Sequence, residues 1–541
     1  MTTLSLAAVL AEAARRYPDK IAVVDAGTRV TYKDLWQQSR SYAAGLRELG
    51  VGPGDTVAML IPNVLDFPRV YYAALAVGAT IVPVHLLLTA DEMAYVLRDS
   101  GTDVLVAHCS QLALGAAAAH AAGTRLVCVG SLPVGLADAP ERLEEAAAGV
   151  PPLRTYVTRE AEDIAVVFYT SGTTGQPKGA LLTHLNLVMN ATVNVFDAND
   201  ARQDDVVLGC LPLFHTFGQT VGMNGTFRLG GTLVLLARFS GEAAIELMVR
   251  EGVTVFHGVP TMYIALLEAA AKADELLSLP AAESRRQDLL SLPAAENRRQ
   301  NLPKLRLCVS GGASLPMAVL ERFRETFHAT IFEGYGLSET SPTATTNQPA
   351  FGTKAGTIGH PIWGVEVEIA RPELEERIEF LPTGELGEIV IRGHNVFAGY
   401  LNRPEETAQA MVDGWFRSGD LGTKDADGFI TIVDRKKDLV IRGGFNVYPR
   451  EVEEALARHP AVVQVAVIGV PDEVQGEEIC AVVVADGDGL TEEELIKWSK
   501  DRLGRHKYPR LVRFVDALPL GPSHKVLKRE LRQTFSRQET G

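Results

Sequence analysis

The chain has 541 residues, of which 46% are hydrophobic and 22% charged, and its formal net charge is −15. This length exceeds one ordinary domain, so at least two folded domains with a large core are expected. The negative charge argues against a nucleic-acid-binding protein, which needs a basic face. The five cysteines are scattered, without close pairs or metal-ligand spacing, which predicts reduced thiols in a cytoplasmic protein.

The first hundred residues contain two apolar stretches that call for a membrane test. Residues 4–10 are apolar, but charged residues follow at helical spacing, which favours an amphipathic helix over an export signal. Residues 70–90 are long enough to span a bilayer. Gly78 and Pro83 divide them into a helix-like and a strand-like half. A buried helix–strand step is therefore predicted, and no transmembrane segment is expected.

Up to about residue 160, helical and strand patterns alternate, which predicts parallel sheets covered by helices. The segments that carry the alternation are a helix over 35–49, a strand over 56–61, a helix over 91–99 and a strand over 104–107. Residues 137–162 are rich in proline, alanine and glutamate, and we expect them to form a surface connection.

A strand-like run over 164–169 leads into a loop dense in hydrogen-bond donors. Glycines can turn their N–H groups toward an anion, hydroxyls add donors, and a lysine adds positive charge. The predicted phosphate cradle consists of Thr170, Ser171, Gly172, Thr173, Thr174, Gly175 and Lys178. It is not a Walker A loop, because the spacing of its glycines differs and Gly179 follows the lysine in place of serine or threonine.

This loop resembles the phosphate-binding signature of the adenylate-forming enzymes, which include acyl-CoA synthetases, adenylation domains of peptide synthetases and luciferases. The resemblance covers nearly the whole chain, and the later motifs recur in the family's order. It implies the acyl-CoA synthetase branch, with ATP, Mg²⁺ and coenzyme A. The α/β fold expected is a large N-terminal adenylation domain over 1–433, of parallel-rich sheets covered by helices plus a small β-barrel-like part. A hinge over 434–438 and a small, mobile α+β C-terminal domain over 439–541 follow.

Aromatic residues beside glycine over 211–218 suit the wall of an acyl pocket. A lone histidine there, His215, is often structural, but the resemblance places it between the ATP and acyl sites. Amino-acid-activating relatives carry an aspartate in this motif, and its absence points to an acid without an α-amino group. The expected pocket residues are Phe214, His215, Phe217, Gly218, Val259 and Pro260.

Two further motifs follow strand-like runs, and ligands of open α/β sheets collect at such carboxyl ends. Small residues let a flat base lie against the backbone, and Tyr335 offers a ring for stacking. Glu339 is an oxygen ligand suited to Mg²⁺, and Thr340 can bond an α-phosphate oxygen. With the family's adenine and metal motif as a guide, the expected nucleotide-binding set is Gly311, Gly312, Ala313, Glu333, Gly334, Tyr335, Gly336 and Thr340.

The remaining expected site residues come from the last quarter of the chain, and the resemblance assigns their roles. Asp420 and Arg435 contact the ribose, Lys437 occupies the hinge, Gly443 and Gly444 let the thiol chain pass, and Lys525 is the mobile catalytic lysine. His524 replaces the glycine that usually precedes this lysine. Lys528 is an alternative with a weaker claim, because it lies on a helical stretch.

Residues 277–289 are nearly duplicated over 290–302. Two copies are too few for a solenoid, so an exposed insertion is predicted.

These motifs together predict ATP-dependent activation of a carboxylic acid through an acyl-AMP, followed by thioester formation with coenzyme A. Catalysis is expected from Lys525, Thr170, His215 and Glu339. A medium- or long-chain fatty acid is preferred, which would place the enzyme in fatty acid metabolism, and an aryl acid of cinnamate or benzoate type comes second. Other readings left open are a carrier-protein-loading ligase, a luciferase-like oxygenase and a non-catalytic sensor. The partners expected are small molecules, with a homodimer as an open alternative.

Overall fold

The structure is a computed structural model that describes residues 3–132, 140–170, 176–278, 302–472, 474–487, 489–520 and 526–536. The chain divides into two compact units. Unit 1 comprises Met1–Glu366 and Arg392–Met411, and unit 2 comprises Val367–Ile391 and Val412–Gly541.

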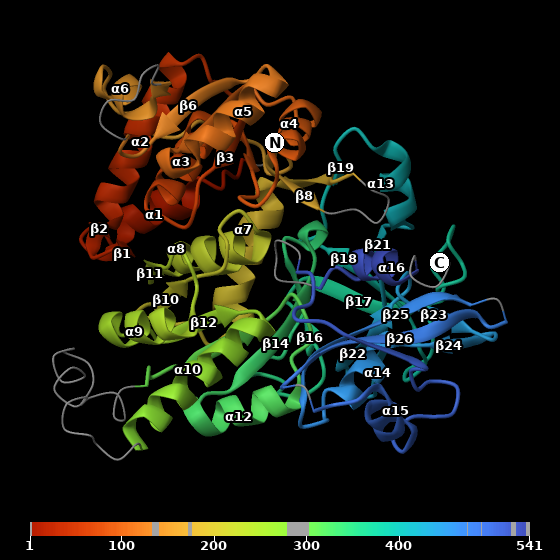
Figure 1. The fold of residues 1–541 in the computed structure, drawn as a ribbon. Coiled ribbons are helices and arrows are strands. Elements are labelled where there is room, and N and C mark those ends of the chain that lie inside the picture. The colour runs from red at the N-terminus through yellow and green to blue at the C-terminus, as the bar shows by residue number, and fades with distance from the viewer. Residues whose placement is uncertain are drawn as a thin grey trace. The chain divides into compact units, whose positions relative to one another are not determined.

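A nine-stranded sheet forms the lower half of unit 1 in Figure 1, with its central strands in yellow and green. Six of its strands are mutually parallel, and an antiparallel strand or pair closes each edge. In spatial order the strands are β16 (His360–Pro361), β15 (Thr343–Thr346), β14 (Ile331–Gly336), β13 (Leu307–Ser310), β12 (Val255–Gly258), β10 (Val206–Gly209), β11 (Thr232–Leu235), β1 (Ile21–Asp25) and β2 (Thr28–Thr31).

The second sheet of unit 1 has eight strands, and its middle is again parallel. Its antiparallel end carries the segment that leads into and out of the expected phosphate loop, because β8 and β9 pair as a hairpin. In spatial order the strands are β19 (Gly399–Tyr400), β9 (Lys178–Thr183), β8 (Ile164–Thr170), β4 (Thr80–Pro83), β3 (Thr56–Leu60), β5 (Val104–His108), β6 (Arg125–Val129) and β7 (Glu141–Arg142).

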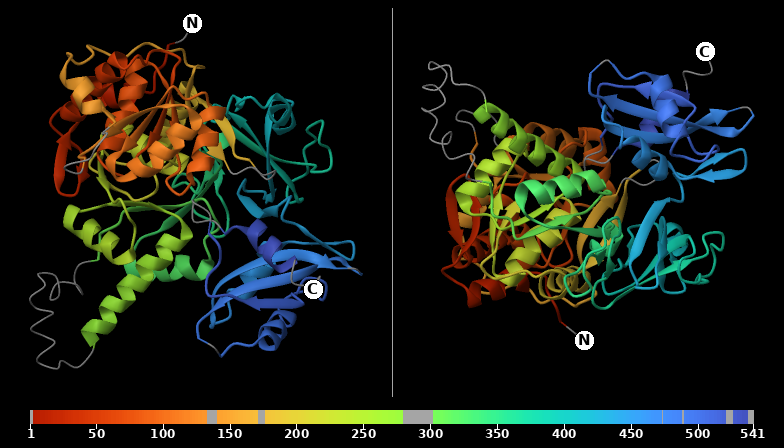
Figure 2. Two further views of the ribbon diagram at one scale, coloured as in Figure 1. Left: turned by 45° about the horizontal axis from the view of Figure 1, so that its top comes forward. Right: turned by 90° about the horizontal axis from the view of Figure 1, so that it is seen from below.

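Helices cover both sheets of unit 1, as Figures 1 and 2 show from different sides. The α-helices of unit 1 are α1 (Ala8–Arg16), α2 (Tyr32–Glu48), α3 (Asp66–Val77), α4 (Ala90–Asp99), α5 (Leu112–Ala122), α6 (Leu143–Ala148), α7 (His184–Val193), α8 (Gly225–Leu229), α9 (Gly241–Glu251), α10 (Pro260–Ser278), α12 (Met317–Phe327) and α13 (Pro404–Ala410). Two short 3₁₀-helices are η1 (Cys109–Gln111) and η4 (Ser338–Thr340), and two π-helices are η2 (Asn194–Ala198) and η3 (Phe217–Asn224).

The helix α3 ties the two sheets of unit 1 together. Ten of its twelve residues are buried, which explains why the sequence over 70–77 is apolar on every side. The hydroxyl of Tyr72 donates to Asn224 Oδ1 at 2.8 Å, and the Tyr72 ring lies 5.9 Å from that of Phe227. The predicted helix–strand step is confirmed, since α3 ends at a left-handed Gly78 and β4 follows. Among the helices of the described residues, none has the length and apolar character of a membrane span.

Unit 2 contains two sheets. The first is largely antiparallel and has β17 (Val365–Ala370), β18 (Gly387–Gly393), β21 (Trp415–Lys424) and β20 (Met411–Val412) in order, with β22 (Ile430–Arg435) on β21. The second has β24 (Phe445–Val447), β23 (Val440–Arg442), β26 (Gly476–Ala485) and β25 (Val462–Asp472) in order, with β27 (Leu511–Phe514) on β26.

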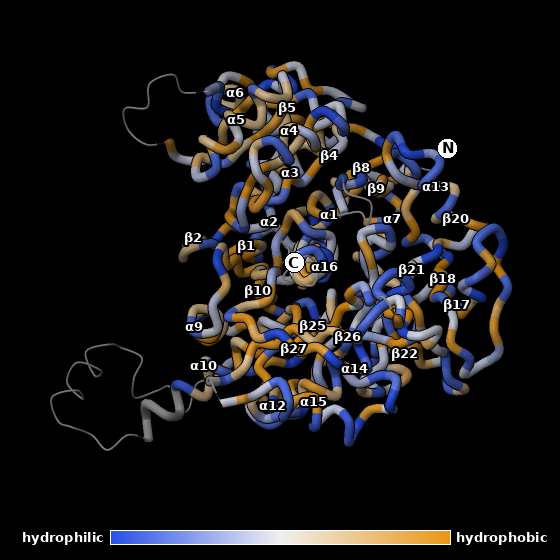
Figure 3. The backbone as a smooth tube through the Cα atoms, turned by 45° about the vertical axis from the view of Figure 1, so that its right-hand side comes forward, coloured by the Kyte–Doolittle hydropathy of each residue, from blue (hydrophilic) through white to orange (hydrophobic). Residues whose placement is uncertain are grey.

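Helices cover both faces of this second sheet. Helices α14 (Pro449–Leu456) and α15 (Glu492–Lys500) pack on one face through Val452, Leu456 and Leu495. Helix α16 (Lys528–Ser536) packs on the other face through Leu531. Figure 3 shows the apolar residues concentrated along strands such as β25, as burial on two faces requires.

The predicted α/β architecture is confirmed, and one local expectation is wrong. The segment over 137–162 was expected to be a surface connection, but within it β7 and α6 form. Leu143 and Ala147 lie one helical turn apart and are buried. Ala147 packs against Gly45 of α2, where an added Cβ would lie 2.9 Å from the Ala147 backbone nitrogen. The glutamate–alanine run is therefore a packed helix rather than a solvated linker.

A buried histidine makes the stability of unit 1 depend on pH. His184 is 1% exposed, its Nδ1 accepts from the Leu6 N–H at 3.0 Å, and burial lowers its pKa to about 4. Between pH 6.5 and 4 the unfolded chain binds the proton that the folded chain refuses, so stability falls as pH falls. Lowering the pH from 7.5 to 5 should cost about 2 kcal/mol through this group.

The measurement is urea unfolding of the wild type and His184→Gln at both pH values. A glutamine can still accept the Leu6 hydrogen bond but does not titrate, so the variant should lose less stability on acidification. Equal losses in the two proteins would contradict the assignment.

Candidate functional site

In unit 1, most of the expected nucleotide and acyl residues follow the carboxyl ends of neighbouring parallel strands. The pairings Gly258 with Ser310 and Ser310 with Glu333 place the ends of β12, β13 and β14 side by side. Val259 and Pro260 follow β12, Gly311 to Ala313 follow β13, and Glu333 to Gly336 end β14. The sequence pattern alone predicted that site residues lie at the carboxyl ends of these strands, and the strand register places those ends next to one another.

Close approach explains why glycine stands at the centre of this edge. A Cβ at Gly311 would lie 3.2 Å from the Phe217 ring and 3.5 Å from the Gly334 carbonyl oxygen. The Phe217 ring and the Gly334 backbone therefore leave little room for a side chain at position 311, and a larger residue there would push the ring away. Gly312 and Ala313 are exposed and Tyr335 is half-buried, which leaves their surfaces open.

The motif around His215 is joined to this edge. Phe217 N–H donates to His215 Nδ1 at 3.2 Å, which holds the imidazole at the start of η3. The Thr216 and Ser338 hydroxyls lie 3.2 Å apart, so the histidine motif contacts the helix η4 that carries Glu339. Phe214 packs on the His85 ring, with 4.3 Å between ring centroids. His215 is thus held close to both the aromatic wall and η4.

Glu339 lies at the centre of a polar cluster. Its side chain is 8% exposed, and the hydroxyl of Tyr400 donates to its Oε1 at 2.8 Å. Phe397 N–H donates to the Glu339 carbonyl oxygen at 2.9 Å. Burial raises the pKa of Tyr400, and the Glu339 carboxylate adds to the rise. Tyr400 therefore stays protonated near neutral pH and can act only as the donor toward this carboxylate.

The same tyrosine contacts the end of the expected phosphate loop. Strand β19 pairs with β9, so Tyr400 lies beside Ala180. Lys178 Nζ lies 5.3 Å from the centroid of the Tyr400 ring and 4.0 Å from Glu406 Oε1. Thr170 pairs with Lys178 across the β8–β9 hairpin. Tyr400 thus contacts both Lys178, at one end of the loop, and Glu339, the expected metal ligand.

Two polar side chains of this edge have local partners within the protein. The Thr340 hydroxyl accepts from Leu337 N–H at 2.8 Å and donates to the Pro342 carbonyl oxygen. Glu333 Oε1 accepts from Leu315 N–H at 3.3 Å, which holds the loop after β13. These contacts shape the backbone on which Gly311 and Tyr335 lie, and the nucleotide roles of Thr340 and Glu333 stay predictions.

In unit 2, Asp420 and Arg435 are paired. They stand opposite each other on β21 and β22, and Arg435 Nε lies 3.2 Å from Asp420 Oδ1. Lys437 is exposed in the turn between β22 and β23. Gly443 and Gly444 both have left-handed backbone, with φ of 56° and 80°, in the turn between β23 and β24. The expected hinge over 434–438 lies inside unit 2 and stays a prediction.

Comparisons with known proteins agree with these motifs. Residues 10–401 match the family described as AMP-binding enzyme, and residues 451–525 match the AMP-binding enzyme C-terminal domain. The chain is a member of the AMP-binding enzyme family. The adenylate-forming enzyme predicted from the sequence, an AMP-forming acid–thiol ligase, is therefore confirmed.

Three proteins similar to this AMP-binding enzyme match nearly the whole length of its chain. A feruloyl-CoA synthase from Amycolatopsis sp is 38% identical over 524 residues, 96% of this chain and 97% of that protein. A long-chain-fatty-acid–CoA ligase from Bacillus subtilis is 33% identical over 557 residues, 97% of this chain and 94% of that protein. The crystal structure of ATP-bound MatB from Rhodopseudomonas palustris matches with a TM-score of 0.84 and 33% identity, over 98% of this chain and 99% of that one.

Several residues expected in the site of this AMP-binding enzyme lie outside the described residues. They are Ser171, Gly172, Thr173, Thr174, Gly175 and Lys525, and most of the duplicated segment over 277–302 also lies outside. Lys528, the alternative lysine, begins α16, and its Nζ lies 2.7 Å from Glu453 Oε1. This ion pair engages its ammonium within unit 2.

Sequence reasoning missed Tyr400 altogether. A tyrosine that follows Ala-Gly in a two-residue strand carries no periodic signal, and its role becomes visible only when β19 pairs with β9. Such pairing joins positions more than 200 residues apart, which no local pattern encodes. A search for aromatic residues beside glycine, the criterion applied to 211–218, would have selected it as a candidate.

Glu339 suits the way in which nucleotide-binding enzymes hold Mg²⁺. Mg²⁺ is commonly held by one or two carboxylates together with substrate phosphates, rather than by a cage of protein ligands. Glu339 is one buried carboxylate, joined through Tyr400 to Lys178 at the end of the phosphate loop, and it suits this mode. When bound there, the ion would supply positive charge to the triphosphate.

Proposed function

We propose that this AMP-binding enzyme is an ATP-dependent carboxylic acid–CoA ligase, which forms an acyl-AMP and then a thioester with coenzyme A. The observation that carries the proposal is the cluster of Lys178, Tyr400 and Glu339 at the β8–β9 hairpin. It supplies a cation, a fixed donor and a carboxylate suited to Mg²⁺ next to a loop rich in backbone donors. That combination suits a nucleotide triphosphate.

The chemistry requires positive charge that is already in position. A carboxylate and a triphosphate repel each other, and pre-oriented cations and donors lower the barrier without reorganisation at the moment of reaction. Lys178 and the Thr170–Gly175 loop bind the departing pyrophosphate, and Lys525 approaches the bond that forms between the carboxylate and the α-phosphate. The mixed anhydride then has AMP as its leaving group, which a thiol can displace.

The acid is expected to be apolar near its carboxylate and to lack an α-amino group. The pocket segment of Phe214, His215 and Phe217 contains no acidic side chain that could pair with an amine. The relatives include ligases named for both a long-chain fatty acid and an aryl acid. The preference for fatty acids drawn from the sequence stays a prediction, as do a cytoplasmic location and a homodimer.

Pyrophosphate release tests this function directly. With ATP, magnesium and a panel of fatty and aryl acids, we expect acid-dependent release of pyrophosphate. Added coenzyme A should allow multiple turnovers, with AMP and an acyl-CoA detected by mass spectrometry. ATP binding without acid-dependent pyrophosphate release would instead favour a sensor. Thioester formation only on an added carrier protein would favour a carrier-loading ligase.

A further inference from the structure

A small cavity lies within unit 1 between the π-helices and the nine-stranded sheet. Its walls come from η2, η3, α8, β10, β12 and β13 and are mainly apolar. The polar side chains among its lining residues are Asn194, Asn199, Asp205, Thr226 and His257. Its volume of about 20 Å³ gives room for one water molecule or one hydroxyl group. π-helical turns often occur at functional sites, and two of them border this cavity.

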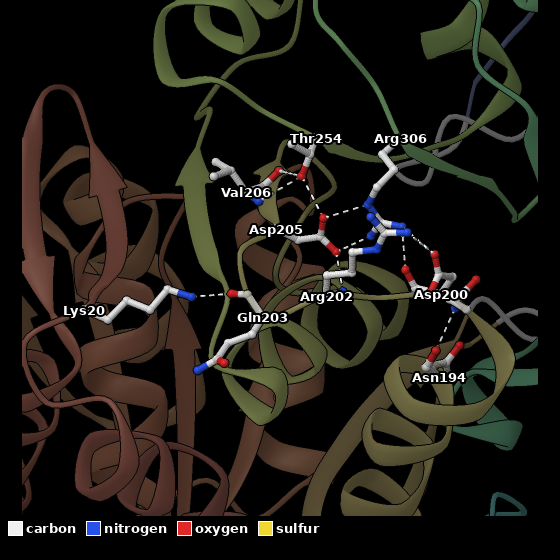
Figure 4. Close-up of polar contacts among 10 residues, drawn as sticks. Lys20, Asn194, Asp200, Arg202, Gln203, Asp205, Val206, Thr254 and Arg306 are labelled. Atoms are coloured by element: carbon white, nitrogen blue, oxygen red, sulfur yellow. Dashed lines mark hydrogen bonds and ion pairs between the residues drawn. The ribbon is translucent and has the colours of Figure 1, made fainter.

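Most of these polar groups are engaged within the protein. Asp205 accepts from the Thr254 hydroxyl at 2.9 Å and forms an ion pair with Arg306 (Figure 4). The amides of Asn194 and Asn199 donate to backbone carbonyls one helical turn back in the chain. The carboxylate that borders the cavity is thus neutralised, and it adds no free charge to the space.

Two buried polar atoms of the lining side chains have no hydrogen-bond partner within the described part of the protein. They are His257 Nδ1 and Asn199 Oδ1, on side chains that are 6% and 8% exposed. Because Asn199 Nδ2 donates to the Asn194 carbonyl oxygen at 2.9 Å, its Oδ1 must be the free acceptor. Leaving such a buried atom unpaired is unfavourable, so a ligand group that fills the cavity is favoured only where it pairs with both atoms.

A hydroxyl group matches the two atoms. Burial lowers the pKa of His257 to about 4, so the imidazole is neutral near pH 7. Nδ1 then either donates or accepts, according to the tautomer. A hydroxyl can donate to Asn199 Oδ1 and accept from Nδ1–H at once, whereas a methyl group leaves both unpaired.

One lining residue of the cavity, His257, neighbours the expected acyl pocket. His257 lies on β12, which ends at Gly258, and the segment of Val259 and Pro260 follows. Its ring centroid is 6.1 Å from that of Phe217, and a Cβ added at Gly311 would lie 3.2 Å from the same Phe217 ring. A flat acid lying along Phe217 would therefore direct its far end toward His257. The space beyond admits one hydroxyl-sized group, which is too little for a long alkyl chain.

We propose that His257 and Asn199 recognise a hydroxyl group on the ring of a short aryl acid, and that such acids are the preferred substrates. The inference rests on the proposed ligase function and names its substrate class. It differs from the sequence-based preference for fatty acids because the depth and polarity of a pocket depend on side chains from β12 and the loop after η2.

The test compares two acids of matched length, 4-hydroxycinnamate and 4-methylcinnamate, with the shorter cinnamate as the unsubstituted reference and decanoate as the aliphatic reference. For the wild type, kcat/KM should be about 10²-fold higher for the hydroxy acid than for the methyl acid, because the methyl group leaves two buried polar atoms unpaired. In His257→Phe this ratio should fall to within a few-fold, with activity toward the methyl acid retained. His120→Phe changes an exposed histidine of α5 and should keep the wild-type ratio.

The outcomes separate the two proposals. Thioester formation with equal kcat/KM for the hydroxy and methyl acids, or with decanoate preferred, would overturn the inference and leave the ligase function standing. The two buried atoms would then hold only water. No pyrophosphate release with any acid would overturn the proposed function itself. If His257→Phe does not fold, calorimetric binding of the hydroxy and methyl acids to the wild type gives the same comparison, with the hydroxy acid expected to bind at least tenfold more tightly.

Discussion

Replacing Glu339 with glutamine is expected to lower acid-dependent pyrophosphate release by about 10²–10³-fold, the loss typical of removing one preorganised electrostatic group. Glutamine keeps the shape of the side chain and can still accept from the Tyr400 hydroxyl. It removes the charge that suits a divalent cation. We therefore expect the magnesium concentration for half-maximal activity to rise, and Mn²⁺ binding in the presence of ATP, followed by electron paramagnetic resonance, to weaken in parallel.

Two further variants sharpen this experiment. Tyr400→Phe deletes only the hydroxyl that donates to Glu339 at 2.8 Å. We therefore expect pyrophosphate release to fall less than in Glu339→Gln, and the magnesium concentration for half-maximal activity to rise again. Glu366→Gln removes an exposed carboxylate of unit 1 that pairs with Arg392, and it should leave both readouts unchanged. A Glu339→Gln enzyme with reduced turnover but unaltered Mn²⁺ binding would contradict the metal assignment.

Replacing Lys525 with alanine is expected to separate the two half-reactions. Adenylation should fall by about 10²–10³-fold, because the cation that approaches the forming bond is lost. Thioester formation from supplied acyl-AMP should stay within a few-fold of wild type, since we propose that rotation about Lys437 withdraws this lysine before the thiol attacks. Pyrophosphate release and acyl-CoA formation from synthetic acyl-AMP measure the two steps.

Lys528→Met is the matched comparison for this lysine assignment. Lys528 is held by Glu453 at 2.7 Å, so its loss should affect stability more than adenylation. The two-conformation account fails if Lys525→Ala slows both half-reactions equally. If only Lys528→Met loses adenylation activity, Lys528 rather than Lys525 is the catalytic lysine.

Patterns that repeat along the chain were readable from the sequence. The alternation of helices and strands predicted the parallel sheets, and Gly78 and Pro83 predicted the break between α3 and β4. The glycine-rich runs after β8 and β13 marked the loops at strand ends. For residues 137–162 the composition led to the wrong prediction of a surface connection. The burial of Leu143 and Ala147 depends on packing against α2, at Gly45, which is distant in the sequence.

The sequence by itself determined the family, the order of the elements and the residue types that a nucleotide and an activated acid require, because these are local properties of short motifs. Only the tertiary structure decided that Tyr400 joins Lys178 to Glu339, and that His257 and Asn199, each with an unpaired buried polar atom, line one cavity. Both arrangements arise from contacts between strands and helices far apart in the chain. Such contacts are set by sheet register and helix packing, and no single stretch of sequence records them.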